Sequence, residues 1–518
     1  VIVGMSGAEY PTRLWIDALD TETGRQVWRR YTIPAPGEAG YDTWGDKDPQ
    51  AANFGGGSAW ITGSYDPDLD TLYWSTGNPN PDWDGMNRVG DNLYTNSTLA
   101  LNPDTGEIKF HYQYTPWDVW DFDGVNETIL ANVGGRKVWL HGDRNGYLYQ
   151  IDRTNGRFLW AQEISRVNWN TGFTAEGKPI IAQDKVPTYT NKAMNVCPAS
   201  EGGKWWNPMS YSPVAKTVVV PSREICVDIL AGASERTEGK YNLGIAEADW
   251  IKGHGQLVAF DAITGQKTWT VEAPSPFTSG VLTTGGGLVF AGTPEGEFQA
   301  FDIRSGEKLW SYQTGSGIVG SPVSFSVNGK QYVAVPSGWG GWTGWATWGG
   351  KGGAPHLKNN RKGGTLFVFA LFDGAAINTT EQRAVMHFLL RNPPFRQNGQ
   401  GFDAIKSIEA PLQGPLREVL DVRAAMLAYA ERVRTDPGIT DIVNIGSPGS
   451  GGTPFTTYYA VPQYLTNTNK SLFGGGTSPI YGAQPRNWNA LDSGIWLREQ
   501  QPRSNRWHAL TVNNRRWS

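Results

Sequence analysis

An eleven-residue pattern of apolar and polar positions recurs five times along the chain. It has the form Ala-x-Asp-x-x-Thr/Ser-Gly-x-x-x-Trp, so an apolar segment runs into an Asp, a short polar turn and then an aromatic residue. Full copies occupy residues 18–28, 259–269 and 300–310, and degenerate copies occupy residues 100–110 and 150–160. This recurrence predicts a repeated supersecondary unit.

Each copy of the pattern is typical of a β-hairpin. The Asp side chain can accept hydrogen bonds from backbone N–H groups of the turn, the Gly tolerates a positive φ, and the aromatic residue starts the second strand. Trp269 and Trp310 lie 41 residues apart, which matches the roughly 40 to 50 residues of a four-stranded propeller blade. We expect the tryptophans of the pattern to dock neighbouring blades and to carry no chemistry.

The pattern changes after Asp373. Apolar residues at helical spacing predict amphipathic helices over residues 379–392 and 411–435. From about Gly446 the chain is rich in Gly, Asn, Thr, Trp and Arg, without a recognisable repeat. We therefore divide the chain into a propeller over residues 1–373, a small helical segment over 374–445 and an irregular tail of unknown role over 446–518.

Composition and charge narrow the classes of function. The 518 residues include 65 Gly and 24 Trp, which favours turns and a repeated architectural use of tryptophan. A net charge of −4 without any run of Lys or Arg argues against nucleic acid as a partner. No stretch reaches the roughly 20 apolar residues that span a bilayer, and residues 1–4 are typical of a strand instead of a signal peptide.

Cys197 and Cys226 are the two cysteines of the chain. They allow neither a CxxCH haem attachment site nor a zinc quartet. The residues alone are compatible with one disulfide, which would place the protein outside the cytosol, and also with two buried thiols.

Several other segments combine glycines, aromatic rings and oxygen-bearing side chains. They are Gly4-Met-Ser6-Gly-Ala-Glu9, Gly55-Gly-Gly-Ser58-Ala-Trp60, Ser75-Thr-Gly-Asn78-Pro79, Thr115 to Glu127 with the triplet Asp121-Phe122-Asp123, and His141-Gly-Asp143-Arg144-Asn145-Gly146. Glycines let the backbone approach a flat ligand closely, and an indole offers a stacking face. Taken singly, the Asn-Pro pair and residues 143–146 are also ordinary turn sequences.

The repeat and these segments together resemble the dehydrogenases of alcohols and methanol that depend on pyrroloquinoline quinone (PQQ). The resemblance covers about residues 1–373 and implies an all-β fold of the eight-bladed β-propeller type. It also implies that roughly the first quarter of the usual catalytic domain, including an adjacent-cysteine disulfide, is missing before Val1. The implied activity is oxidation of a primary alcohol by hydride transfer to metal-bound PQQ, with electrons passed to a periplasmic cytochrome c.

The resemblance assigns a role to each candidate site residue. Asp121 resembles the catalytic base, which must stay ionised to take the proton of the alcohol, and Arg144 resembles the arginine that contacts the reactive carbonyl of PQQ. The further cofactor contacts are Ser6, Ser58, Trp60 and Trp342, with Trp60 as the floor beneath the quinone. The metal ligands are Glu9, Asn78, Asp121 and Asp123.

These four ligands form an all-oxygen set, which selects hard cations. Asp123 stands two residues after the base, where calcium-dependent relatives carry a small or uncharged residue, and this resembles the lanthanide-dependent members. We therefore expect a lanthanide ion, with calcium as the alternative. A carboxylate that merely caps a turn stays open as a second interpretation of Asp123.

The resemblance further implies that Cys197 and Cys226 form an inter-blade disulfide and that Arg223 replaces an asparagine near the cofactor. The expected partners are a small primary alcohol and a cytochrome c, and a homodimer is allowed. Two alternatives stay open. One is a non-enzymatic propeller scaffold that binds proteins, which would have no reason to keep the site residues together. The other is an inactive fragment, because the missing blades normally contribute PQQ contacts.

Overall fold

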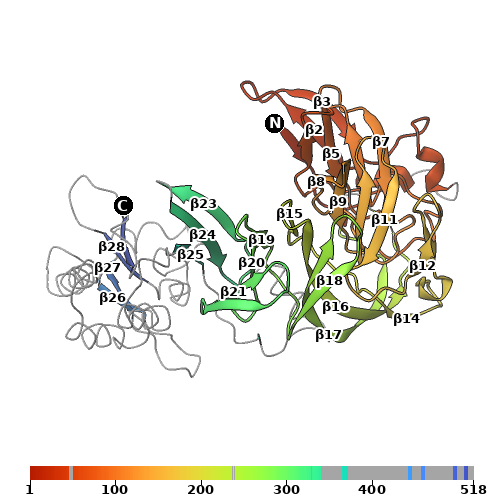
Figure 1. Cartoon of the computed structure of the whole chain (residues 1–518). Helices are drawn as coiled ribbons and strands as arrows, with labels where there is room; N and C mark the ends of the chain where they lie inside the picture. Colours follow the sequence, from red (N-terminus) through yellow and green to blue (C-terminus); the bar gives the residue numbers. More distant parts are fainter. Residues whose placement is uncertain are drawn as a thin grey trace, which may run out of the picture. The chain divides into compact units, whose positions relative to one another are not determined.

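The computed structural model describes residues 1–45, 51–235, 237, 240–327, 330–339, 357 and 364–370, and four short strands further along the chain (Figure 1). The described part is built almost entirely from antiparallel β-strands, and the chain divides into two compact units. The first unit contains residues 1–294 and 299–310, and it carries the candidate site. Among the described residues, no helix is long and apolar enough to cross a membrane.

The first unit begins with three successive sheets, each formed by consecutive strands in antiparallel order. The first sheet contains β1 (Ile2–Gly4), β2 (Trp15–Leu19) and β3 (Gln26–Tyr31). The second contains β4 (Ser64–Asp66), β5 (Thr71–Ser75), β6 (Ser97–Leu101) and β7 (Ile108–Gln113). The third contains β8 (Ile129–Val133), β9 (Arg136–Gly142), β10 (Tyr147–Asp152) and β11 (Phe158–Glu163). Three short 3₁₀ helices lie in this unit, η1 (Tyr41–Trp44), η2 (Ala51–Phe54) and η3 (Gln183–Lys185).

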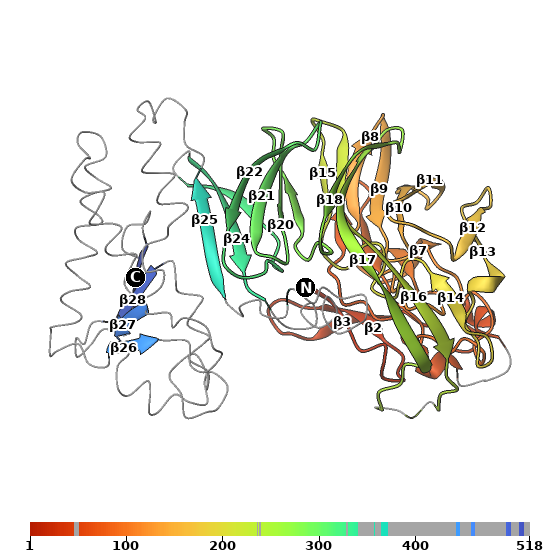
Figure 2. The same ribbon diagram turned by 90° about the horizontal axis from the view of Figure 1, so that it is seen from below.

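A hairpin and two further sheets follow in the chain. A small hairpin, β12 (Asn170–Phe173) and β13 (Pro179–Ile181), precedes a five-stranded sheet of β14 (Ala193–Val196), β15 (Ser210–Ser212), β16 (Thr217–Ala231), β17 (Ile245–Asp261) and β18 (Lys267–Ala273). Figure 2 shows β16 and β17 as a long hairpin that extends well beyond β18. The next sheet contains β19 (Val281–Thr283), β20 (Leu288–Gly292), β21 (Glu297–Asp302) and β22 (Lys308–Gln313).

The second unit contains a three-stranded sheet and two hairpins. The sheet is formed by β23 (Val323–Val327), β24 (Lys330–Ser337) and β25 (Thr365–Ala370). The hairpins are β26 (Ile442–Ile445) with β27 (Thr457–Ala460), and β28 (Gly494–Arg498) with β29 (Trp507–Thr511). The helices expected over 379–392 and 411–435 lie outside the described residues, and the division at 373 and 445 stays a prediction.

All five copies of the sequence pattern form the predicted hairpins, namely β2–β3, β6–β7, β10–β11, β17–β18 and β21–β22. The turn chemistry is as expected: in the first copy, Asp20 Oδ1 accepts hydrogen bonds from the backbone N–H groups of Glu22 and Thr23. Gly24 follows with a φ of 68°. This left-handed conformation is inexpensive only for a residue without a Cβ atom.

In the first four copies, the aromatic residue docks on the glycine of the next copy, as predicted. A Cβ atom added to Gly106 would lie 2.5 Å from the ring of Trp28, and one added to Gly306 would lie 2.8 Å from the ring of Trp269. The two indole nitrogens donate to backbone carbonyls of the neighbouring turn, Trp28 Nε1 to Pro103 at 2.9 Å and Trp269 Nε1 to Ile303 at 2.9 Å. These repeated contacts make the fold a β-propeller, whereas the expected number of eight blades stays a prediction.

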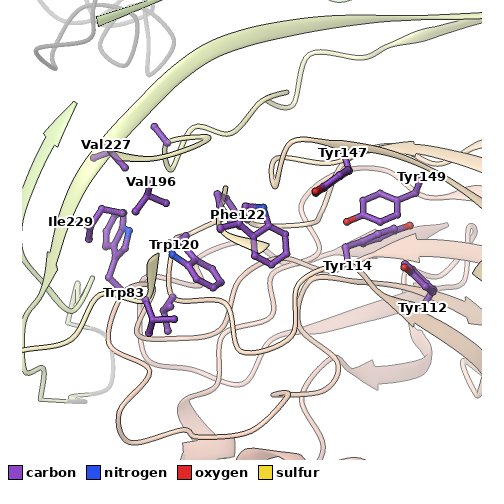
Figure 3. Close-up of a cluster of buried hydrophobic side chains, with 14 of the residues drawn as sticks. Trp83, Tyr112, Tyr114, Trp120, Phe122, Tyr147, Tyr149, Val196, Val227 and Ile229 are labelled. Atoms are coloured by element: carbon purple, nitrogen blue, oxygen red, sulfur yellow. The ribbon is translucent and has the colours of Figure 1, made fainter. Parts of the chain in front are cut away.

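A cluster of buried aromatic side chains includes residues of β7, of β10 and of the loop that follows β7 (Figure 3). Tyr112, Tyr114 and Tyr149 pack against one another, and Trp120 and Phe122 lie beside each other further along the cluster. Burying large aromatic surfaces is among the stronger contributions to a core. The cluster therefore anchors the loop that follows β7 in the core.

Candidate active site

The loop from Thr115 to Glu127 holds the Asp121-Phe122-Asp123 triplet in an unusual conformation. Phe122 is fully buried, 5.5 Å from the ring of Trp120 and 5.4 Å from that of Trp169. Asp121 and Asp123 have φ values of 62° and 43°, which are uncommon for residues with a side chain. Because the backbone turns at both positions, the aromatic ring enters the core while both carboxylates face the site.

Asp118 fixes this loop from within. Its carboxylate is buried and accepts hydrogen bonds from the backbone N–H groups of Trp120 at 2.9 Å and Phe122 at 2.8 Å, and from the side-chain amide of Asn96 at 2.7 Å. Burial raises the pKa of Asp118, and these hydrogen bonds oppose that rise. Asp118 is therefore a positioning residue for Asp121 and Asp123.

Arg144 joins the two carboxylates of the triplet, as the sequence predicts for residues of one site. Its Nη1 donates to Asp123 Oδ2 at 2.7 Å, and its Nη2 lies 3.5 Å from Asp121 Oδ2. The Nε atom also donates to the carbonyl of Ser200 at 3.1 Å. With two anchors, the guanidinium is held in a fixed orientation at the site.

Asn78 and Ser58 lie on the other side of Asp123. The N–H of Gly57 donates to the carbonyl of Asn78 at 2.9 Å, and the N–H of Gly77 donates to the carbonyl of Ser58 at 2.6 Å, so the two segments run side by side. A Cβ atom at Gly77 would lie 2.0 Å from Asp123 Oδ1 and 2.6 Å from Ser58 Oγ. The predicted segments therefore converge on Asp123, and a glycine is needed at position 77.

Glu9, Ser6 and Trp60 complete the described part of the predicted set. Ala59 donates its N–H to the carbonyl of Met5 at 2.7 Å, which holds the segment of Ser6 beside that of Trp60. Ser6 is exposed, and Glu9 and Trp60 are partly buried. Trp342, the other predicted cofactor contact, lies outside the described residues.

The carboxylates influence one another strongly. Burial raises the pKa of Asp121 well above its ordinary value; attraction to Arg144 opposes the rise, and the charge of Asp123 adds to it. Burial also raises the pKa of Asp123 to about 6, again opposed by Arg144 and reinforced by Glu9. A bound cation would reverse this balance and favour the ionised carboxylates.

The donor chemistry of the set fits a hard cation. Asp123 is 4% exposed, and its Oδ1 has no hydrogen-bond partner among the described residues. Buried carboxylate oxygens without a partner are costly unless a ligand satisfies them. In the described part of the chain, however, no three His, Cys, Asp or Glu side chains converge closely enough to hold a metal ion. The set of Glu9, Asn78, Asp121 and Asp123 therefore stays a prediction.

Cys197 and Cys226 form the expected disulfide. Cys197 directly follows β14, Cys226 lies in β16, and these strands pair with each other. The bond is thus formed within one sheet, and the expectation of a link between blades is wrong, because the long β16–β17 hairpin extends far enough to pair with β14. The disulfide fixes the start of the loop that carries Ser200, the residue whose carbonyl anchors Arg144.

Three further residues of the site are not among the site residues predicted from the sequence. Asp82 is 1% exposed, its Oδ1 has no hydrogen-bond partner among the described residues, and its pKa is raised well above the ordinary value by burial and by the charges of Asp121 and Glu9. Trp205 and Trp206 pack together, and Trp206 also meets Trp60 with ring centroids 5.9 Å apart. Two signals could have revealed them: the Asp-Trp-Asp run after Asn78, and the Gly-Gly-Lys-Trp-Trp sequence, which resembles the glycine-rich segment before Trp60.

Comparison with known proteins identifies the propeller. Residues 9–176 and 241–333 match the family model for PQQ enzymes described as glucose/ethanol/alcohol dehydrogenase, beta-propeller domain. Residues 359–473 match a different model, phosphoglucose isomerase. Most of this second range lies outside the described residues.

Individual relatives agree with the first match. The quinoprotein alcohol dehydrogenase PedH of Pseudomonas putida is 40% identical over 72% of this chain and 66% of the relative. The lanthanide-dependent methanol dehydrogenase of Methylacidiphilum fumariolicum is 36% identical over 66% of this chain and 60% of the relative.

Solved structures are also similar. A europium-containing methanol dehydrogenase superposes with a TM-score of 0.66 and 34% identity, covering 71% of this chain and 72% of that one. The quinohemoprotein alcohol dehydrogenase of Comamonas testosteroni superposes with a TM-score of 0.63 and is 32% identical. The match covers 80% of this chain and 69% of that one.

The chain spans between about half and two thirds of the length of the first curated relatives that it matches. Within that span, the matched ranges include the docking motifs and the loops of Asp121, Asp123 and Arg144. The chain belongs to the family of PQQ-dependent alcohol dehydrogenases with a β-propeller domain.

Proposed function

We propose that this chain is the catalytic propeller of an enzyme that oxidises a primary alcohol to the aldehyde. The observation that carries the proposal is the convergence of Asp121, Asp123 and Arg144 in one buried site. A non-enzymatic scaffold would need the docking tryptophans, but it would not need carboxylates held at positive φ or a guanidinium fixed between them.

In the proposed reaction Asp121 takes the hydroxyl proton of the alcohol as hydride leaves its carbon. A positioned general base of this kind contributes about 10²- to 10⁴-fold to a rate. When bound, PQQ supplies the electrophilic quinone carbon that accepts the hydride. Arg144 stabilises negative charge that develops on an adjacent oxygen, because its guanidinium is already oriented before the reaction.

Trp60 would offer its indole face to the flat cofactor, with Ser6, Ser58 and Trp342 as further contacts. Glu9, Asn78, Asp121 and Asp123 would hold the metal. We propose a lanthanide ion, with calcium as the alternative, because the extra carboxylate of Asp123 adds negative charge to an all-oxygen set.

Electrons would then pass to a cytochrome c, and we propose a periplasmic location for the enzyme. The disulfide supports an oxidising compartment, where such bonds form and persist. We assign the activity to residues 1–373. Because part of the remaining chain resembles another family, we propose no role in alcohol oxidation for residues 374–518.

The proposal is tested by dye-linked oxidation of ethanol by the whole chain after incubation with PQQ and either lanthanum or calcium. Activity that requires PQQ, and that is higher with lanthanum than with calcium, is the expected result. Equal activity with the two metals would contradict the lanthanide assignment. No activity with either metal would contradict the enzymatic function.

A further inference from the structure

Arg223 is a buried cation whose guanidinium ends without a hydrogen bond in the described part of the chain. It lies in β16 and is 2% exposed. Neither Nη1 nor Nη2 has a hydrogen-bond partner among the described residues. Buried guanidinium groups are normally paired, because removing the charge from water without compensation is unfavourable.

The position of Arg223 connects it to the candidate site. Its backbone N–H donates to the carbonyl of Gly203 at 2.9 Å, and the N–H of Gly203 donates to the carbonyl of Arg144 at 2.9 Å. The guanidinium lies 4.8 Å from the ring centroid of Trp205, which contacts Trp206. Arg223 is therefore joined to Arg144 through the backbone of Gly203, and its guanidinium contacts one of the two paired tryptophans.

Within the described part of the chain, no carboxylate forms a hydrogen bond with the Nη atoms of this cation. Glu201 attracts Arg223, but its Oε2 accepts a hydrogen bond from Trp250 Nε1 at 2.8 Å. Asp123 Oδ2 is already bonded to Arg144. Burial lowers the pKa of Arg223 to about 10, so the side chain is still charged at neutral pH.

We propose that Arg223 is a second cationic contact for the anionic quinone, and that its free Nη atoms bind an oxygen of the ligand. This inference rests on the proposed function. A planar guanidinium can bind a carboxylate through two parallel, charge-assisted hydrogen bonds or donate to a quinone oxygen, whereas a neutral amide donates without the charge. Together with Arg144, Arg223 places two positive charges beside a ligand that carries several negative ones.

The test is a titration of the whole chain with PQQ in the presence of lanthanum. Quenching of tryptophan fluorescence reports the binding and gives the Kd. Arg223→Gln is expected to raise the Kd at least tenfold, and Arg223→Lys, which keeps the charge, is expected to raise it less. The control is Arg157→Gln, because Arg157 is an exposed arginine that directly precedes β11. Its Kd should equal that of the unmodified chain.

The outcomes separate this inference from the proposed function. If the unmodified chain does not bind PQQ, the proposed function fails, and this inference fails with it. If the unmodified chain binds PQQ and Arg223→Gln binds it equally well, only the role of Arg223 is overturned. Arg223→Gln should still fold in the absence of PQQ, because neither Nη atom forms a hydrogen bond with the described residues and the amide relieves the burial of an unpaired charge. A variant that fails to fold would show that Arg223 supports the fold, and would overturn the proposal.

Discussion

The docking motifs and the candidate site are built from the same residue types, but they satisfy their polar groups differently. In the docking motifs, Trp28 Nε1 and Trp269 Nε1 donate to carbonyls of the next turn, and Asp20 caps its own turn. Trp160 Nε1 is the exception, because it has no partner among the described residues. In the site, by contrast, several buried oxygens and nitrogens of charged side chains have no hydrogen bond to any described residue.

This difference separates packing from ligand binding. Asp82, Asp123 and Arg223 each keep at least one buried polar atom without a hydrogen bond among the described residues. Such groups are destabilising unless something outside the chain satisfies them. Apart from Trp160 Nε1, the docking motifs named above satisfy their polar groups within the chain, whereas the site needs a ligand to do so. Changes in the motifs should reduce stability, and changes in the site should mainly reduce binding and catalysis.

The largest effect is expected at Asp121. Asp121→Asn should lower kcat for dye-linked alcohol oxidation by about a thousandfold, because an amide cannot accept the proton. The variant should melt at the same or a higher temperature, because burying the charged carboxylate is more unfavourable than losing its attraction to Arg144. Asp68→Asn, which changes an exposed carboxylate, is the control and should keep full activity. A kcat within tenfold of the unmodified value would exclude Asp121 as the base.

The disulfide should combine both effects. Replacing Cys197 and Cys226 by alanine opens a loop with a sequence separation of 29 residues. This should lower the free energy of unfolding by about 3 to 4 kcal/mol, measured by urea denaturation. Because the same loop carries the carbonyl of Ser200, which anchors Arg144, PQQ binding should weaken as well. Unchanged PQQ affinity would show that the loop keeps its conformation without the bond.

A matched pair of glycines tests the docking contacts alone. Gly106 and Gly24 have nearly the same φ, 70° and 68°, but a Cβ atom would lie 2.5 Å from Trp28 at the first position and has no neighbour within 4 Å at the second. Gly24→Ala should cost about 1 kcal/mol of stability through backbone strain, and Gly106→Ala about 3 kcal/mol, because steric overlap adds to that strain. Equal losses in thermal unfolding would contradict the docking interpretation.

The smallest expected effect concerns the metal. Asp123→Ala should weaken lanthanide binding on the order of tenfold to a hundredfold, a loss typical of removing one carboxylate that supports a metal site. Terbium luminescence excited through tryptophan measures this without catalysis. Calcium binding, measured by competition with terbium, should change less, because a divalent ion gains less from the additional charge. An unchanged affinity for terbium would leave Asp123 as a turn residue held by Arg144.

The sequence was sufficient to predict the local features of the fold. Each hairpin depends on an Asp, a Gly and an aromatic within eleven residues, so the five hairpins and their docking contacts follow from the pattern itself. The clustering of Asp121, Asp123 and Arg144 was predicted through the resemblance to the dehydrogenases, and the structure brings these residues together.

Features that depend on long-range geometry were not predicted. The pairing of β14 with the extended β16 decides that the disulfide lies within one sheet, and no local pattern encodes the length of that hairpin. Asp82 becomes a site residue only because the chain brings it near Asp121 and Glu9, and Trp206 only because it meets Trp60. In each case the partners are remote in the sequence, so spacing alone carries no signal.

We infer that the unpartnered carboxylate oxygens of the site belong to a bound metal ion and the unpartnered guanidinium of Arg223 to a bound quinone. Equilibrium dialysis of the whole chain against PQQ, with lanthanum present, tests it most directly. We predict saturable binding of one PQQ per chain, together with a higher melting temperature, because a ligand that binds only the folded state stabilises it. Failure to bind PQQ at any lanthanum or calcium concentration, by a chain that is folded and carries its disulfide, would contradict the claim.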